Sequence, residues 1–397
     1  MDLRVTDEEK KLRQEVRDFA KKELPDGWMP SFFLQEAEEK FEFDITKKMA
    51  QHHWIGRAWP KEYGGGGVST VEDYVFTDEA SYWGIPNALH LSSSIIGPSI
   101  IYFGNDEQKK KFLPLMLNGD RDGVFCLGYA EPQSGTDQAN VKVMAKREGD
   151  EYVVNGTKIF TSFAHRAKWG WMIVRTDPQS ERHHGLSLMI LDMKQPGVRI
   201  DPIIGMNGWY ITNETHYINA RTPVSYRVGE EGQGWTVLMG ALNFERAMLG
   251  VSGAHRHYTD ELVTYARETK KNGTALANDP IVRNKLANAA VNVEVLYLLG
   301  LRIAWMQDQG LIPASEASTA KVFASEFGVD MCNMGMEVLG PYAYLRPGSK
   351  YAKLYGALER DYNVVFVAKF GGGVNEVQRD IVAQFGLGMP KAARGAR

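Results

Sequence analysis

Both ends of the chain show apolar residues at helical spacing. Thr6-Asp7-Glu8-Glu9 has the composition of a capping box, which predicts the start of a helix. An apolar stripe follows at intervals of three to five residues, formed by Leu12, Val16, Phe19 and Leu24. Pro25 ends this pattern. Further helices are predicted from Asp44 toward Trp54, over Val71–Tyr82 and over Asn105–Leu117.

From about Asp120 the pattern changes to that of strands. Tyr152-Val153-Val154 and Thr157-Lys158-Ile159-Phe160 flank Asn155-Gly156, which predicts a hairpin with a type I′ turn at these two residues. Four more strands are expected between Gly, Pro and Asn residues, over Trp169–Thr176, Leu186–Asp192, Val198–Ile204 and Glu214–Asn219. Short strands at this spacing predict a compact antiparallel β-domain.

After Gly232-Gln233-Gly234 the helical period returns. One stripe consists of Leu286, Ala289, Val293, Leu296, Gly300 and Ile303, and a second of Ala320, Phe323, Phe327 and Met331. Long helices with such seams form bundles. The predicted fold class is therefore α+β and multidomain. It has an all-α domain over residues 1–120, a β-domain over 121–230, a helical bundle over 231–387 and a loose tail over 388–397.

Composition narrows the function. The 397 residues carry a formal net charge of -3 without a basic stripe, which argues against nucleic acid as a partner. Two cysteines provide neither a disulfide framework nor a thiolate metal cluster, and no metal-ligand spacing is present. No signal sequence and no apolar run of membrane-spanning length are recognised. We therefore expect a soluble cytoplasmic protein without metal or membrane contacts.

One carboxylate interrupts an apolar stripe. Glu245 lies seven residues after Leu238, three after Leu242 and four before Leu249, so it shares their helix face. A carboxylate on such a face is desolvated, and desolvation raises the pKa as a general base requires. The alternative interpretation is a structural ion pair with a distant cation.

Several segments together resemble the acyl-CoA dehydrogenase family, over about residues 5 to 389. The two that carry the resemblance most clearly are Cys126–Asp137 and Asn155–Ser162. The others follow in the family's order and are Trp59–Gly65, Gly205–Trp209, Thr222-Pro223, Val228–Gly234 and Asn375–Arg379. The resemblance implies a helical N-terminal domain, a β-barrel-like middle domain and a C-terminal four-helix bundle.

The resemblance also implies a chemistry. Members bind FAD and oxidise an acyl-CoA thioester to its trans-2-enoyl form, using a carboxylate to remove the α-proton. Gly372 stands where most members carry that carboxylate, and its N–H remains available to polarise the thioester carbonyl. Other members place the base on the first long helix of the last domain, which makes Glu245 the predicted base. Arg246 is a candidate contact for CoA, and Gly371–Gly373 leave room for a branched or steroid-type acyl group.

By the same resemblance, the flavin site is formed by residues from four parts of the chain. The implied cofactor contacts are Leu127, Tyr129, Ala130, Thr136, Phe160, Thr161, Ser162, Gly340 and Asn375, with Thr136 also placed near the substrate. Phe160 is expected to cover the flavin ring and Ser162 to place a hydroxyl near N5. The chain departs from the family in two places: Ala130 replaces a common hydroxyl, and Arg267–Lys270 is only a poor counterpart of the segment that a neighbouring subunit contributes to FAD.

These departures leave several hypotheses open. The leading hypothesis is an acyl-CoA dehydrogenase of lipid or steroid catabolism, working as a homotetramer or an α2β2 heterotetramer with a related subunit. Its implied electron acceptor is electron-transferring flavoprotein. A second hypothesis is a non-catalytic subunit that completes the FAD site of a partner. A third is a flavin oxidase or monooxygenase of the same family.

Overall fold

The computed structural model describes residues 6–32, 38–247 and 250–391, and the side chains of residues 243–247 also lie outside the description. The chain forms two compact units. The helical unit comprises Met1–Glu36, Ser69–Ile85 and Arg246–Arg397, and the sheet unit comprises Ala37–Val68 and Pro86–Glu245. The units interleave along the sequence, so they are groups of contacting residues rather than the consecutive domains expected above, whose boundaries stay a prediction.

Seven helices are described in the helical unit. They are α1 (Asp7–Glu23), α3 (Thr70–Trp83), α7 (Gly253–Glu268), α8 (Pro280–Asp308), α9 (Ala314–Leu339), α10 (Ala357–Tyr362) and α11 (Asn375–Ile381), with a small hairpin of β9 (Lys270–Lys271) and β10 (Thr274–Ala275) after α7. Thr6 and Glu9 form the predicted capping box of α1. The predicted helix over Val71–Tyr82 corresponds to α3, whose N-cap is Ser69.

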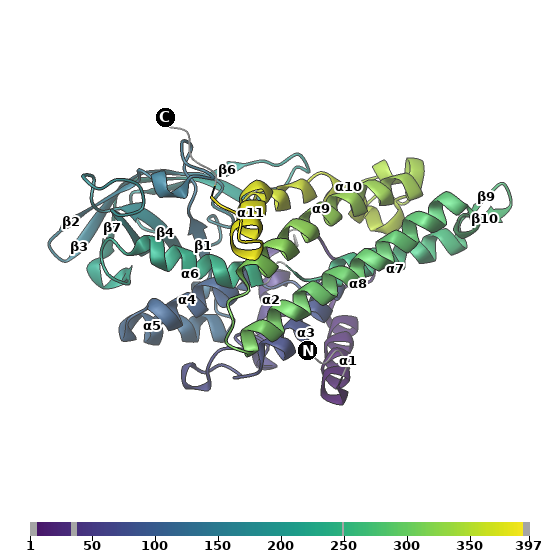
Figure 1. Ribbon diagram of the computed structural model, residues 1–397, viewed down its shortest axis with the longest axis horizontal. Coiled ribbons are helices and arrows are strands. Elements are labelled where there is room, and N and C mark those ends of the chain that lie inside the picture. The colour runs from purple at the N-terminus through teal and green to yellow at the C-terminus, as the bar shows by residue number, and fades with distance from the viewer. Residues whose placement is uncertain (1–5, 33–37, 248–249, 392–397) are drawn as a thin grey trace. The chain divides into compact units, whose positions relative to one another are not determined.

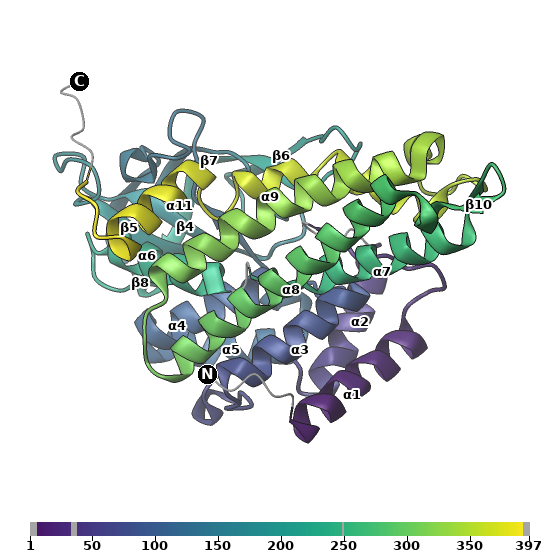
Figure 2. The same ribbon diagram turned by 45° about the vertical axis from the view of Figure 1, so that its right-hand side comes forward.

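The long helices α8 and α9 lie side by side in both ribbon views (Figures 1 and 2). All six residues of the predicted α8 stripe are buried. Ala320, Phe327 and Met331 of the α9 stripe are buried too, while Phe323 is partly buried and packs on the same core. The predicted bundle seam is therefore confirmed for these two helices, because the residues repeating at helical spacing form the contact between them.

A second face of α8 is apolar and exposed. Val291 is 62% exposed, Val295 38% and Leu298 40%, at intervals of four and three residues. Among the described residues, α8 is the one helix that reaches membrane-spanning length and hydropathy, contrary to the expectation from the sequence. Core helices of soluble proteins meet this criterion as well. Its apolar character thus comes from two faces, one packed in the bundle and one uncovered.

The sheet unit contains one sheet of eight strands. The strands are β1 (Phe125–Gly128), β2 (Met144–Glu148), β3 (Glu151–Lys158), β4 (Trp169–Arg175), β5 (Leu186–Asp192), β6 (Val198–Ile203), β7 (Thr212–Pro223) and β8 (Arg227–Val228). Their order is β6-β7-β3-β2-β4-β5-β8, with β1 paired to β4. The prediction of antiparallel pairing holds for most neighbours, but β1 runs parallel to β4, and β2 meets β4 in a single parallel pair.

The predicted hairpin turn at Asn155-Gly156 is wrong. These residues lie inside the continuous strand β3, and the hairpin turns instead between Glu148 and Glu151. The register of β3 with β7 shifts between Val154 and Gly156, so the pair forms a bulge. A Cβ on Gly156 would lie 2.8 Å from Cγ2 of Val143. Gly156 therefore allows close packing within the strand. The prediction missed this role because Asn155 before Gly156 is typical of a hairpin turn.

Four helices belong wholly or mainly to the sheet unit: α2 (Glu39–Gln51), α4 (Gly97–Phe103), α5 (Asp106–Leu117) and α6 (Gly234–Ala247). The predicted helix over Asn105–Leu117 corresponds to α5, whose N-cap is Asn105. The predicted start of the second helix at Asp44 is wrong by five residues. Glu42 lies on the buried face of α2, where its carboxylate pairs with Arg166 at 2.6 Å. Because this buried position carries a charged residue, the apolar pattern does not reveal the first turn of the helix.

Candidate active site

A strained turn follows strand β3. Phe160 has φ +55° and Phe163 has φ +62°, in the left-handed region that costs an L-residue about 1–2 kcal/mol. The side chain of Phe160 is 63% exposed, whereas that of Thr161 beside it is fully buried. Ser162 is partly exposed. This backbone thus presents an aromatic ring and a hydroxyl outward on either side of a buried anchor, a type of strain that clusters at ligand sites.

A buried ion pair joins this turn to the loop after β1. Nζ of Lys158 lies 2.9 Å from Oε1 of Glu131, and both side chains are fully buried. Lys158 also donates to the backbone oxygen of Tyr129 at 3.2 Å. The Glu131 carboxylate accepts from the backbone N–H groups of Lys142 and Val143 at 2.7 and 2.9 Å. Burial lowers the pKa of Lys158 to about 8, and the Glu131 carboxylate opposes this shift.

The predicted residues of the first segment lie at this junction. Ala130 accepts a hydrogen bond at 2.9 Å from the N–H of Ile159, next to Phe160. Leu127 is partly buried in β1, Tyr129 is buried, and Thr136 is exposed. A Cβ on the adjacent Gly135 would meet nothing within 4 Å. The structure therefore brings together the two sequence segments that carry the family resemblance.

Three predicted residues belong to the helical unit. Gly372 has φ +67°, and its carbonyl accepts from Nε2 of Gln378 at 3.1 Å. Gly340 has φ +59°, and a Cβ there would meet open space. Both glycines therefore suit a backbone that a ligand approaches closely.

Asn375 has a different setting. Its side chain is only 2% exposed, and its Oδ1 accepts from Nζ of Lys321 at 2.6 Å. Its Nδ2 lies 3.0 Å from Oγ of Ser325 and 3.2 Å from Oε1 of Glu326. These bonds tie α11 to α9 and so support the Gly371–Gly373 turn, while a contact of Asn375 with a cofactor stays a prediction.

The side chains of Glu245 and Arg246 lie outside the described residues. Both belong to α6, in which Leu238 is fully buried and Leu242 partly buried. The apolar helical stripe that motivated the Glu245 hypothesis is therefore present up to Leu242. The role of Glu245 as the base stays a prediction.

Glu131, Lys158 and Asn213 were not singled out from the sequence. Asn213 on β7 is fully buried. Its backbone oxygen accepts from the N–H of Thr161, and its Nδ2 donates to the backbone oxygen of Thr161. The polar residues Asn213 and Thr215 alternate on one buried face of β7 and could have signalled it, but the partner of Asn213 is 52 residues away in the chain.

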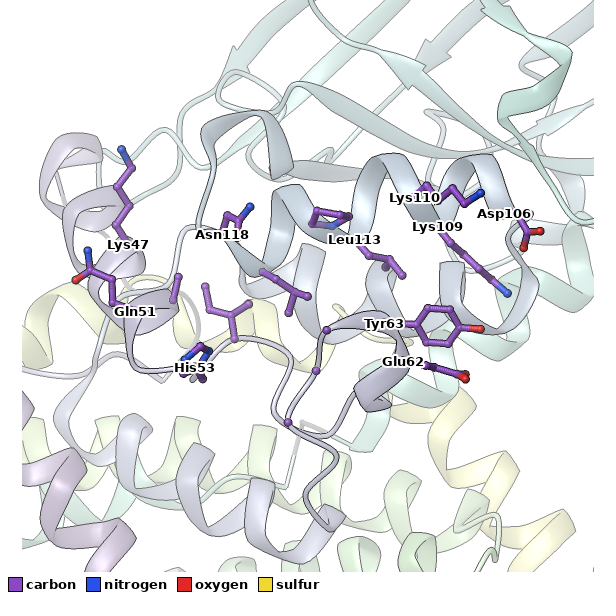
Figure 3. A pocket seen from close by; sticks show the side chains of 17 residues that line it. Lys47, Gln51, His53, Glu62, Tyr63, Asp106, Lys109, Lys110, Leu113 and Asn118 are labelled. Atoms are coloured by element: carbon purple, nitrogen blue, oxygen red, sulfur yellow. The ribbon is translucent and has the colours of Figure 1, made fainter.

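A cavity of about 970 Å³ opens elsewhere in the sheet unit, between α2, the 3₁₀ helix η1 (Lys61–Tyr63) with its following glycines, and α5 (Figure 3). Leu113 and other apolar residues form its middle, with Lys47 at one end and Lys109 and Lys110 at the other. None of the predicted site residues lines it. It is therefore separate from the turn after β3. No group of three or more metal-ligating side chains occurs among the described residues.

The sequence and the fold match one family throughout. Residues 6–120, 126–219 and 232–387 match the N-terminal, middle and C-terminal domains of acyl-CoA dehydrogenases. Acyl-CoA dehydrogenase FadE26 of Mycobacterium tuberculosis is 40% identical over 359 residues, which is 88% of each chain.

Two solved structures extend this likeness. The Tcur3481-Tcur3483 steroid ACAD has 36% identity and a TM-score of 0.90, covering 99% of this chain and 100% of that chain. The ChsE4-ChsE5 complex from Mycobacterium tuberculosis has 37% identity and a TM-score of 0.89, with the same coverage.

Proposed function

Because the chain belongs to the acyl-CoA dehydrogenase family, and is therefore an FAD-dependent oxidoreductase of acyl-CoA thioesters, we propose that Glu245 is its base and that its acyl group is bulky and steroid-like. The observation that supports the flavin site of this enzyme is the turn after β3. Its exposed Phe160 ring and partly exposed Ser162 occur in the segment that matches the family's flavin site.

The described residues fit a flat cofactor. Phe160 offers an aromatic face, Ser162 a hydroxyl, and the exposed stretch around Gly135 and Thr136 leaves the backbone approachable. Phe160, Ser162 and Thr136 would hold the flavin. Bound FAD supplies the oxidant that takes up the β-hydrogen as hydride.

The chain itself supplies the base and the carbonyl donor. Glu245 takes the α-proton on its carboxylate, which the apolar stripe of α6 would desolvate and make more basic. The N–H of Gly372 donates to the thioester oxygen, where negative charge develops as the proton leaves. This division of roles follows the family resemblance.

Two features support a bulky acyl group. Gly371–Gly373 place no side chains beside the proposed thioester position. One of the two similar structures is described as a steroid ACAD. A fused-ring acyl group needs such space near its reactive carbons, since side-chain bulk there would block its approach.

We also propose that the enzyme is an oligomer that passes its electrons to electron-transferring flavoprotein. The exposed apolar face of α8 supports association, because such a stripe is costly to leave in water. The similar ChsE4-ChsE5 structure is a complex of two named components. An α2β2 assembly with a related subunit would also complete the part of the FAD site for which Arg267–Lys270 is a poor match.

The test is anaerobic titration of the purified chain with acyl-CoAs of different size while the flavin spectrum is recorded. Bleaching by steroid-type acyl-CoA supports the proposal. Bleaching by straight-chain substrates alone would contradict the proposed substrate class. A colourless chain that gains flavin with a related subunit would fit the α2β2 assembly, whereas a reconstituted complex that bleaches equally fast with Glu245→Gln would favour the non-catalytic alternative. Glu245→Gln should keep the flavin and lose about 10²–10⁴-fold in bleaching rate. The exposed Glu181→Gln serves as control, and an unchanged rate in Glu245→Gln would remove Glu245 as the base.

A further inference from the structure

Asn213 holds both backbone polar groups of one residue, Thr161, in the turn after β3. Its backbone oxygen accepts from the N–H of Thr161 at 2.9 Å, and its side-chain Nδ2 donates to the backbone oxygen of Thr161 at 3.0 Å. Both side chains are fully buried. A single residue of β7 thus fixes the peptide groups on each side of the Thr161 Cα.

The segment that it holds needs such support. Thr161 lies between Phe160 and Phe163, both with positive φ. Strained residues of this kind persist only where their surroundings over-determine them. On the far side of the turn, the N–H of Phe163 donates to the backbone oxygen of Ile211 at 2.8 Å. The side-chain bond from Asn213 is the contact in this set that depends on residue type, because the others join backbone to backbone.

A neighbouring imidazole fixes the orientation of the amide. Nδ1 of His165 lies 3.3 Å from Nδ2 of Asn213, and its ring stacks on Tyr210 with centroids 4.1 Å apart. Burial and the neighbouring Arg166 lower the pKa of His165 to about 4, which makes the ring neutral at pH 7, and the tautomer protonated on Nε2 accepts from the Asn213 amide at Nδ1. The two N–H bonds of the amide therefore point to two acceptors, Thr161 and His165. An aspartate of the same size would place an oxygen against both.

We propose that Asn213 is a positioning residue of the active site: its amide holds Thr161, and thereby sets the Phe160 ring and the Ser162 hydroxyl against the flavin. The inference rests on the proposed function, because it assigns Phe160 and Ser162 to the cofactor. Asn213 is closed off by burial and acts on the cofactor only through Thr161.

The test compares Asn213→Asp and Asn213→Ala with the wild-type holoenzyme. The matched control is Asn219→Asp on the same strand, where the residue is exposed and has φ +54°, a conformation that Asp tolerates. We measure the flavin absorption spectrum, the rate of anaerobic bleaching, and the substrate dissociation constant. Both Asn213 variants should shift the flavin band and slow bleaching by about 10²-fold, as a displacement near 1 Å does. Substrate affinity should change less than threefold, because substrate does not touch Asn213.

A purely structural role would lower folding stability and leave these readouts of the folded enzyme unchanged. The inference is overturned if folded Asn213→Ala, which buries no new charge, bleaches at the wild-type rate with the wild-type spectrum. Slow bleaching in Asn219→Asp as well would also overturn it, since the effect would then not be specific to the turn. If none of the acyl-CoAs tested bleaches the flavin of the wild-type chain, the proposed function itself is contradicted. The inference about Asn213, which rests on that function, is then contradicted as well.

Discussion

Lys158 and Glu131 form an ion pair, Nζ to Oε1 2.9 Å, in which neither side chain reaches solvent. It joins the end of β3 to the loop after β1, so it links the two segments that are predicted to hold the flavin. The net stabilisation by such a pair is small, because the cost of desolvating two charges offsets most of their attraction. Its importance should therefore show when one partner is removed.

Lys158→Met should destabilise the protein by about 3–5 kcal/mol, because it leaves the Glu131 carboxylate buried without its cation. The measurement is the free energy of unfolding in urea. Lys168→Met is the control, since its pair with Asp192 is about one-third exposed on both sides and should cost less than about 1 kcal/mol. Adding Glu131→Gln to Lys158→Met should restore part of the stability. Equal losses in the two lysine variants would contradict this account.

Phe160→Ala should weaken FAD binding without unfolding the protein. The side chain is 63% exposed and therefore contributes little to the core. Losing one aromatic contact with the cofactor corresponds to about a tenfold higher dissociation constant. Fluorescence titration of the apoprotein with FAD measures it. Tyr102→Ala, which removes another aromatic exposed in the sheet unit, should leave FAD affinity unchanged. Unaltered affinity in Phe160→Ala would argue against the flavin assignment.

Val295→Lys should break the proposed subunit contact on α8. A lysine amine buried at an apolar interface without a partner would weaken association by on the order of 3 kcal/mol, or about 100-fold. Light scattering across a dilution series reports the mass. The control is Ala290→Lys, an exposed position on the same helix about 140° away from Val295. If both variants keep the wild-type mass, the exposed stripe is not the interface.

His255 should make the helical unit sensitive to acid. Its ring lies between Phe32 and Phe327, with centroid distances of 4.8 and 5.0 Å. Burial lowers its pKa to about 4. The unfolded chain, with a pKa near 6.5, then binds the proton first. The stability contributed by neutral His255 is thus present above about pH 6.5 and is lost as the pH falls toward 4, by on the order of 3 kcal/mol.

Urea unfolding between pH 7 and pH 4 measures this loss. His255→Phe keeps an aromatic ring in place and removes the titration, so its stability should depend less on pH over the same window. A wild-type slope that the substitution leaves intact would assign the acid sensitivity to other groups.

The local elements were predictable because short-range rules decide them. Thr6 begins its helix with the predicted capping box, and the predicted strand over Leu186–Asp192 matches β5 residue for residue. The buried stripe of α8 follows from spacing alone. Apolar period and cap chemistry act within a few residues, so they can be read without the fold.

The errors arise where packing between distant segments overrides the local signal. Asn155-Gly156 looks like a turn, but β7 and Val143 hold it in a bulged strand. Glu42 looks solvent-facing, but Arg166 allows it to be buried. In each case the decisive partner lies elsewhere in the chain, which periodicity does not reveal.

The sequence by itself determined most of the helices and many of the strands, their apolar faces and the family to which the ordered motifs point. Only the tertiary structure decided that Lys158 pairs with Glu131 across 27 positions and that Asn213 holds Thr161 across 52. The reason is physical: a buried charge or amide must find a partner, and any of many residues can meet that need until the backbone brings one within about 3 Å.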